Sequence, residues 1–226
     1  MQKTKIPWCD YTINPVKGLC PMACSYCYAR RMYKRFKWNP EIRLDTNGLF
    51  SNLPKKPARI FVGSTIELFG PWVKAEWMSY ILDNVRDWPQ HNFIFLTKWP
   101  ENLAQWSPFP KNCWVGVSAV NAEMAEEAGF WLYDIKATVK FVSFEPLLGR
   151  IPARFADYIS DEVQGINWLI LGSQTQPTRH PPREWVDEII TAADKAKISA
   201  FVKEPMASHY GIQRQEFPGV GGHKAE

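Results

Sequence analysis

Short apolar runs rich in β-branched and aromatic residues recur along the chain and alternate with amphipathic or turn-rich stretches. The runs are nearly continuous in apolar character, which is typical of parallel strands covered on both faces. They predict a short strand near Tyr11–Asn14 and six longer ones. The six are RIFVG (59–63), NFIFLT (92–97), CWVGVS (113–118), VKFVSF (139–144), NWLILG (167–172) and SAFVK (199–203).

Amphipathic helices are predicted between the strands. The clearest are KAEWMSYILDNVRD (74–87) and REWVDEIITAADKAK (183–197), whose apolar residues recur at helical spacing. Alternating strands and helices favour an α/β fold with parallel strands and right-handed crossovers. The spacing of the strands suits βα units, and six or seven units predict a partial (β/α)6-7 TIM-like barrel.

The 226 residues fit a single domain, 1–226. Residues 1–10 form an N-terminal extension in this interpretation, and 205–226 form a C-terminal tail. We expect the tail from Arg214 to be loose or draped over the domain. Asn-Gly and Pro turn signals predict an exposed loop at residues 44–58.

Composition limits the classes of protein that the chain can represent. No apolar run approaches the length needed to cross a bilayer, so we expect no membrane partner. The first ten residues lack the apolar stretch of a signal peptide. Five cysteines are an odd number, and the chain is too long for a small disulfide-stapled domain. These features predict a cytoplasmic protein whose thiols stay reduced.

Basic residues are concentrated near the start of the chain, although the net charge is only +4. Residues 1–60 hold 12 Lys and Arg against 3 Asp and Glu. The segment YARRMYKRFKW (28–38) alternates cations with aromatic residues. Such a segment could attract a nucleic acid, another polyanion or an acidic electron donor of the flavodoxin or ferredoxin type. The alternative is a solvated helix whose aromatic residues point inward.

Three cysteines, Cys20, Cys24 and Cys27, lie within eight residues in the spacing C-x3-C-x2-C. Thiolates hold iron–sulfur clusters, and three ligands leave one iron of a [4Fe–4S] cubane open. Zinc is a weaker interpretation, because structural zinc needs four ligands and no second C-x2-C pair is present. Three inert buried thiols are a further alternative. If Cys9 were a fourth ligand, the cluster would be closed and the protein would be a redox carrier.

Small or polar residues follow the predicted strands. In parallel α/β folds, ligands gather at the carboxyl ends of the strands. Each of these residue types is also common in ordinary turns, so the residues predict a site only as a group. They are Gly63, Ser64, Thr65 and Glu67; Ser118 and Asn121; Ser143 and Glu145; Gly172, Ser173 and Gln174; and Lys203 with Glu204.

The cysteine run, with Tyr26 before its last cysteine, resembles the signature of the radical S-adenosylmethionine (SAM) superfamily. Further stretches resemble a phage-linked branch of that superfamily, which is catalogued mainly as a domain of unknown function. This similarity covers most of residues 8–204. Its stretches are NPVKGLCPMACSYCYAR, FVGSTIELF, FLTKWPENL, GVSAVN, SFEPLLG and the late Lys203.

The resemblance implies roles for particular residues. The three cysteines would bind a [4Fe–4S] cluster whose fourth iron chelates SAM. Tyr26 would lie beside the adenine, and the Gly63-Ser64 backbone would meet the amino group of the methionine moiety. Ser118, Ser143 or Glu145 would contact the ribose hydroxyls, and Gly172 with Gln174 would contact the adenine side.

The resemblance also implies an activity. One electron from a flavodoxin or ferredoxin would cleave SAM reductively, and the resulting 5′-deoxyadenosyl radical would abstract hydrogen from a substrate. We expect Glu145 and Lys203 to act on that substrate, which could be a nucleic acid or a peptide. A lysine at a strand end is costly to bury alone, so Lys203 should face a polar cavity and pair with Glu145 or a bound carboxylate. A purely structural ion pair is the alternative, and a non-catalytic nucleic-acid-binding module is the alternative for the whole protein.

Overall fold

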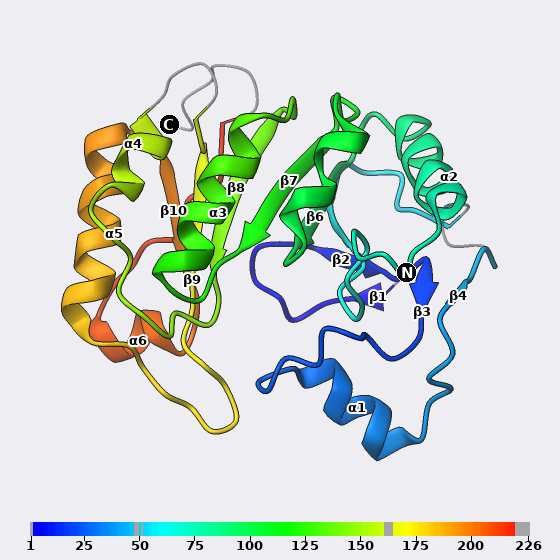
Figure 1. Ribbon diagram of the computed structural model, residues 1–226, viewed down its shortest axis with the longest axis horizontal. Coiled ribbons are helices and arrows are strands. Elements are labelled where there is room, and N and C mark those ends of the chain that lie inside the picture. Colours follow the sequence, from blue (N-terminus) through cyan, green and yellow to red (C-terminus); the bar gives the residue numbers. More distant parts are fainter. Residues whose placement is uncertain (1, 48–49, 51, 161–164, 220–226) are drawn as a thin grey trace.

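The computed structural model describes residues 2–47, 50, 52–160 and 165–219, and its centre is an eight-stranded sheet (Figure 1). The strand order is β1-β2-β5-β6-β7-β8-β9-β10. Only β1 is antiparallel to its neighbour; all the other pairs are parallel. The strands are β1 (Gln2–Lys3), β2 (Tyr11–Ile13), β5 (Arg59–Val62), β6 (Asn92–Thr97), β7 (Cys113–Ser118), β8 (Val139–Phe144), β9 (Trp168–Leu171) and β10 (Ser199–Val202).

The α/β class and the seven predicted strands are confirmed. The sheet does not close, because the described residues show no pairing between its edge strands β1 and β10. Two short strands outside this sheet, β3 (Val16–Lys17) and β4 (Arg43–Leu44), form a separate antiparallel pair.

The helices follow the strands, as the alternation in the sequence predicted. Both helices predicted most clearly are present, as α2 and α5, and short 3-10 turns at Pro100–Asn102 and Ala104–Trp106 follow β6. In Figure 1, α1 lies apart from the others, at the lower edge of the molecule. The helices are α1 (Tyr28–Phe36), α2 (Ala75–Arg86), α3 (Ala122–Tyr133), α4 (Phe155–Ser160), α5 (Arg183–Ala196) and α6 (Met206–Tyr210).

Both faces of the sheet are buried, which explains the continuous apolar runs. Successive side chains of a strand point to opposite faces. In β9, Leu169 and Leu171 therefore join the core shared with the helices, whereas Trp168 and Ile170 join a second cluster on the other face. The apolar side chains of the other long strands are divided between the same two clusters.

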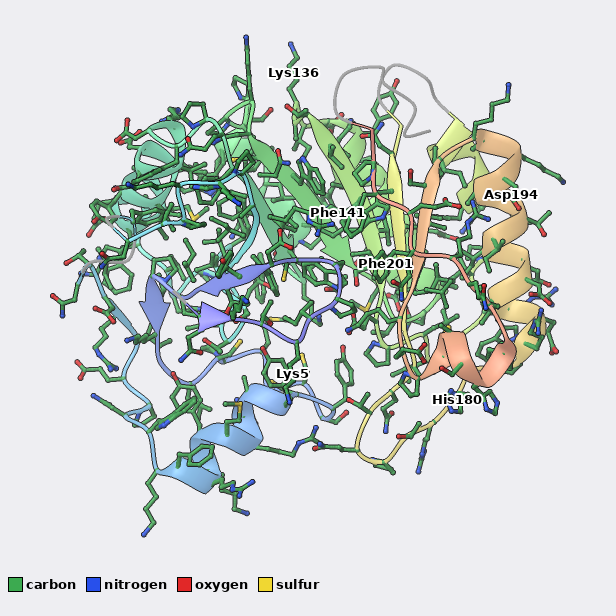
Figure 2. The ribbon with its side chains drawn as sticks, turned by 180° about the vertical axis from the view of Figure 1, so that it is seen from behind. Lys5, Lys136, Phe141, His180, Asp194 and Phe201 are labelled. Carbon is green, nitrogen blue, oxygen red and sulfur yellow. The ribbon has the colours of Figure 1, made fainter. Side chains whose placement is uncertain are left out.

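The second cluster, which we call the inner cluster, is dominated by aromatic rings around Trp168. The ring of Trp168 lies 5.2 Å from Phe141 and 5.7 Å from Trp114, centroid to centroid. Figure 2 shows Phe141 and Phe201 on the sheet from behind. Gly116 makes room for Phe141, because a Cβ at Gly116 would lie 2.4 Å from that ring. The members are Trp8, Cys9, Phe61, Ile94, Trp114, Val139, Phe141, Trp168, Ile170 and Phe201.

One of the predicted loop segments differs from the expectation, and the tail follows one of its two expected alternatives. Phe50 and Leu53 lie in the predicted exposed loop at 44–58, yet both are buried in the helix-side core. The described part of the tail is draped rather than loose. The amide of Val202 donates to the carbonyl of Arg214 at 2.8 Å, and Phe217 packs against the inner cluster. The end of the predicted tail, 220–226, lies outside the described residues.

Within the described residues, no helix is both long enough and apolar enough to span a bilayer.

The inner cluster predicts a large cost for truncating its rings. Phe141 is fully buried, so Phe141→Ala should lower the free energy of unfolding by about 3–5 kcal/mol. Phe130→Ala is the matched control, because Phe130 on α3 is 56% exposed and should change stability by less than about 0.5 kcal/mol. Urea denaturation of both variants measures the difference. Equal midpoints would show that the inner cluster contributes little to stability.

Candidate functional site

Several predicted site residues lie on one face of the sheet, beyond the inner cluster. Because side chains alternate along a strand, Ser143 follows the inner-cluster residues of β8 on the same face, and Glu145 comes next. Ser118 is paired in register with Ser143 across β7 and β8. The same alternation of side chains places Gly172, which follows β9, and Lys203, which follows β10, on this face. The inner cluster therefore fills one end of this face, and polar groups occupy the carboxyl end.

Glu145 and Lys203 form an ion pair at this end of the sheet, with side chains that are 27% and 16% exposed. Their strands are not neighbours, because β9 lies between β8 and β10. The residue in register between them is Gly172, where a Cβ would lie 3.0 Å from Cγ of Glu145. A glycine there lets the two side chains meet over the intervening strand. The predicted pairing is confirmed; action on a substrate stays a prediction.

Ser118 and Ser143 are both almost completely buried, at 1% and 0% exposed. The hydroxyl of Ser143 has no hydrogen-bond partner within the described part of the chain. Buried hydroxyls are seldom left without a partner, so Ser143 is a group that a bound ligand or water could satisfy.

The three-cysteine loop leads directly into α1. The thiol of Cys27 caps this helix and accepts a hydrogen bond from the amide of Arg30 at 3.5 Å. The guanidinium of Arg30 reaches back to the carbonyl of Cys20 at 2.6 Å. The partial positive charge of a helix N-terminus favours a negative group at such a position. The first and last cysteines are therefore tied to the start of the same helix.

Glu67 connects this loop to the strand ends. Its amide donates to the thiol of Cys20 at 3.5 Å. Its carboxylate is 7% exposed and accepts from the Thr97 hydroxyl and the Lys98 amide, both at 2.7 Å, and from the Phe69 amide at 2.9 Å. Burial raises the pKa of Glu67, and these three hydrogen bonds oppose the increase. Burial also raises the pKa of the Cys20 thiol, which the Glu67 amide opposes.

Two further contacts join the loop region to the turn after β5. The side-chain oxygen of Asn14 accepts from the hydroxyls of Ser64 and Thr65 and from the amide of Thr65, each at 3.2 Å. The hydroxyl of Tyr28 donates to the carbonyl of Ser64 at 2.7 Å. The hydroxyl and the carbonyl of Ser64 thus each have one partner within the protein, and the predicted contact of the Gly63-Ser64 backbone with a ligand stays a prediction.

Gly63 has a structural reason to be glycine. Its φ is +79°, and a Cβ would lie 2.5 Å from the side chain of Leu68. Its amide donates to the carbonyl of Ile13 at 2.8 Å. A glycine here relieves both the backbone strain and the overlap. Contact between Gly63 and a cofactor stays a prediction.

Tyr26 lies against the loop itself. It is half-buried and hydrogen-bonded to the side chain of Cys24, and burial raises the pKa of its hydroxyl. Its predicted place beside an adenine is not tested by this contact.

Gln174 lies in the loop that follows β9, where its amide donates to the Pro177 carbonyl at 3.4 Å. The same loop is held from two sides. The guanidinium of Arg31 on α1 donates to the carbonyl of Gln176 at 3.1 Å. Ser173 is hydrogen-bonded to Nδ1 of His180 at 2.8 Å, and Figure 2 shows His180 near α6.

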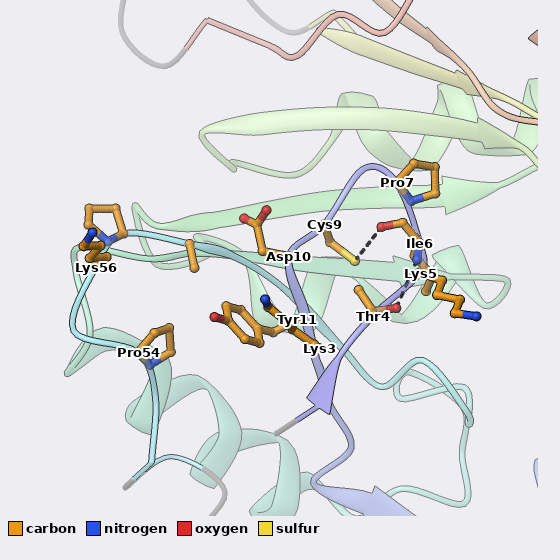
Figure 3. Close-up of a pocket in the computed structure, with 12 residues that line it drawn as sticks. Lys3, Thr4, Lys5, Ile6, Pro7, Cys9, Asp10, Tyr11, Pro54 and Lys56 are labelled. Carbon is orange, nitrogen blue, oxygen red and sulfur yellow. Dashed lines mark hydrogen bonds between the residues drawn. The ribbon is translucent and has the colours of Figure 1, made fainter.

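The cysteines do not form a preformed metal site. Among the described residues, no three His, Cys, Asp or Glu side chains are grouped so as to hold a metal ion. Cys9 belongs to the inner cluster, and its thiol lies 3.9 Å from the carbonyl of Ile6 (Figure 3). Burial raises the pKa of Cys9 to about 12. Nothing in these contacts favours Cys9 as a fourth cluster ligand.

A cavity at the other end of the sheet lies away from the strand ends just described. It has a volume of about 650 Å³ and is open to solvent (Figure 3). Tyr11 and Ala58 in its wall lie at the amino ends of β2 and β5, whereas Glu145 and Lys203 follow the carboxyl ends of their strands. The candidate site is therefore defined by the hydrogen bonds, the ion pair and the strand register described above, and this cavity is separate from it.

Glu67 was predicted only as one of the polar residues that follow the strands, and Asn14 and Tyr28 were not predicted as site residues. Glu67 carried a usable signal, because a lone carboxylate inside the apolar run TIELF must find partners when it is buried. Asn14 and Tyr28 carried none, since neither spacing nor composition reveals their partners.

These features define an α/β protein with a mostly parallel sheet, a polar site at its strand ends and a three-cysteine loop tied to the turn after β5. The chain belongs to the DUF5131 family, described as proteins of unknown function, whose model matches residues 3–209. No curated protein and no solved structure matches the chain.

The Glu145–Lys203 pair should show measurable coupling. Glu145→Gln and Lys203→Met should each lower the free energy of unfolding by about 1–3 kcal/mol, because each leaves a partly buried charge without its partner. The double variant should lose less than the sum, with a coupling energy of about 0.5–3 kcal/mol. Urea denaturation of all four proteins measures this coupling.

The matched control is the exposed pair of Arg150 and Glu188, whose coupling should be much smaller because solvent screens both charges. If the double variant of Glu145 and Lys203 lost as much free energy of unfolding as the two single variants together, the pair would not stabilise the fold.

Proposed function

We propose that this protein is a radical SAM enzyme in which Cys20, Cys24 and Cys27 hold a [4Fe–4S] cluster with one iron free for SAM. The observation that carries the proposal is the contact between the Cys20 thiol and the Glu67 amide, which attaches the three-cysteine motif to the turn that follows the carboxyl end of β5. A cysteine run elsewhere on the surface would not favour chemistry at the sheet.

The donor set fits a cluster. Three thiols with one spacing motif leave an open metal position, and amide hydrogen bonds to cysteine sulfur, as found at Cys20 and Cys27, tune cluster potentials. The described residues are not grouped for metal binding as they stand, so cluster binding requires the three cysteine side chains to move together. When bound, the cluster and SAM would supply one-electron cleavage of SAM and hydrogen abstraction from a substrate.

The fold is compatible with a partial barrel. The inner face of the sheet is filled by aromatic rings, as the interior of a (β/α) barrel is filled by side chains, and polar residues lie at the carboxyl ends. The two edges of the sheet are unpaired with each other in the described residues, which suits an incomplete barrel better than a closed one.

In this proposal the chain's own residues bind and orient the reactants. Ser118, Ser143 and Glu145 would face the ribose of SAM, and Gly172 with Gln174 would adjoin its adenine. The hydroxyl of Ser143, which finds no hydrogen-bond partner among the described residues, supports a ligand in this position. Lys203, held by Glu145, would position a substrate group of negative charge. A flavodoxin or ferredoxin is the electron donor that this chemistry needs.

The test is anaerobic reconstitution with iron and sulfide, followed by reduction in the presence of SAM. The expected result is a cluster bound to the wild type and formation of 5′-deoxyadenosine. Cys24→Ala should lose both, because it removes one of three ligands. The matched control is Cys113→Ala, which replaces a buried cysteine of β7 outside the loop and should retain both.

Three results would contradict the proposal. One is a cluster whose electron paramagnetic resonance spectrum does not change with SAM. Another is a cluster that needs Cys9, shown by its loss in Cys9→Ala. The third is purification with tightly bound zinc that iron does not replace. The second result would favour a redox carrier.

A further inference from the structure

Helix α1 and the turn after it carry cations without acidic partners. Residues 28–40 contain no Asp or Glu. Arg30 and Arg31 are bonded to backbone carbonyls, whereas no bond to a carboxylate is found for Lys34, Arg35 or Lys37 within the described part of the chain. The positive charge of such a patch attracts a polyanion.

Aromatic rings are exposed on the same surface. Phe36 is 52% exposed and Trp38 is 42% exposed. Their rings are stacked, with centroids 5.6 Å apart and planes inclined by 22°, and the guanidinium of Arg35 lies 5.3 Å from the Phe36 ring. The alternative in which the aromatic residues of this segment all point inward is therefore wrong: only Tyr33 is buried.

The rings are held in place before any ligand binds. Lys37 ends α1 in the left-handed conformation, with φ +50°, so that the chain turns back and brings Trp38 edge-on to Tyr33 at 5.3 Å. The hydroxyl of Tyr33 in turn accepts from the amide of Gly18 at 2.8 Å. An exposed aromatic pair fixed by a buried tyrosine loses little conformational entropy on binding.

A groove of about 400 Å³ adjoins these rings. Its lining includes Leu19, which precedes Cys20 in the sequence, and the exposed ring of Trp38. In Figures 1 and 2, α1 stands at the edge of the molecule, where a long ligand can reach it. The groove is lined by Leu19, Arg30, Arg31, Tyr33, Lys34, Trp38 and Pro40.

We propose that this surface, formed by Arg31, Lys34, Arg35, Phe36, Lys37 and Trp38, binds single-stranded nucleic acid. Single strands are bound by basic grooves that follow the phosphates and by aromatic rings on which bases stack. A duplex keeps its bases stacked in its interior, so they cannot stack on the exposed rings of Phe36 and Trp38. An acidic protein would match the cations but would leave two exposed rings without a function.

This binding does not depend on the proposed enzyme activity, because α1 forms the surface whether or not a cluster is present. It can fail while SAM cleavage succeeds, and the reverse also holds. The assay therefore uses the full chain both as purified and after reconstitution, without SAM.

The test measures fluorescence anisotropy with labelled oligo-dT, labelled oligo-U and a duplex of equal length. The wild type should bind at least one single strand more tightly than the duplex, and the two single strands distinguish DNA from RNA. Trp38→Ala should weaken binding by about tenfold, because a base loses its stacking partner. Lys34→Gln with Arg35→Gln should reduce the magnitude of the salt slope, log Kd against log salt concentration, by about 1.4.

Matched controls lie far from α1. Phe130→Ala removes another exposed ring, and Lys136→Gln with Lys195→Gln removes two other exposed cations. Figure 2 shows Lys136 at the end of the molecule opposite to α1. Removing two distant cations should slightly weaken the general attraction of the protein for a polyanion. Apart from this effect, none of these substitutions should change the affinity for the oligonucleotides by more than about twofold. Circular dichroism checks that every variant is folded.

The proposal is overturned if the wild type binds no single strand, binds the duplex equally well, or binds polyglutamate as tightly as the oligonucleotides. It is also overturned if folded Trp38→Ala loses no more affinity than Phe130→Ala.

Discussion

The packing of aromatic rings around Trp168 is the constraint on which the rest of the structure depends. This one side chain contacts rings from the N-terminal segment, from β7, β8 and β10, and from the tail. The rings fill the inner face of the sheet, so a buried ligand can approach this face only where the strands end. The location of the polar residues follows from this, since the alternation of a strand that buries Trp168 and Ile170 must next place Gly172 on the same face.

At that end of the sheet, small residues matter as much as charged ones. Gly172 lets Glu145 and Lys203 meet over β9, and Gly116 accepts the ring of Phe141. The buried carboxylate of Glu67 has the complementary role of joining separate elements. It bonds to β6 and its following turn, while its own amide contacts Cys20. The cysteine loop is thus linked to β6 through a residue that lies outside the motif.

The sequence predicted the long strands because burial on both faces leaves uninterrupted apolar runs, as in VKFVSF. It could not predict β1, β3 or β4, since two paired residues carry no periodicity. The burial of Phe50 and Leu53 was missed for a different reason: turn residues around them indicate a loop but not what the loop's apolar side chains reach. The pair of Glu145 and Lys203 was predictable, because a lysine at a strand end needs a partner. The partners of Asn14 and Tyr28 were not, because they are set by how β2 and α1 meet the turn after β5.

The basic segment shows how one sequence pattern divides into two physical roles. Arg30 and Arg31, in the first turn of α1, donate to the carbonyls of Cys20 and Gln176 and so hold the helix against the cysteine loop and the loop after β9. Lys34, Arg35 and Lys37 come one turn later, beyond the reach of those carbonyls, and share that end with Phe36 and Trp38. The helix is therefore anchored at its start and open at its end. A ligand bound at the open end would adjoin the groove that Leu19 and Trp38 both line, so the surface proposed for nucleic acid lies next to the residue that precedes Cys20.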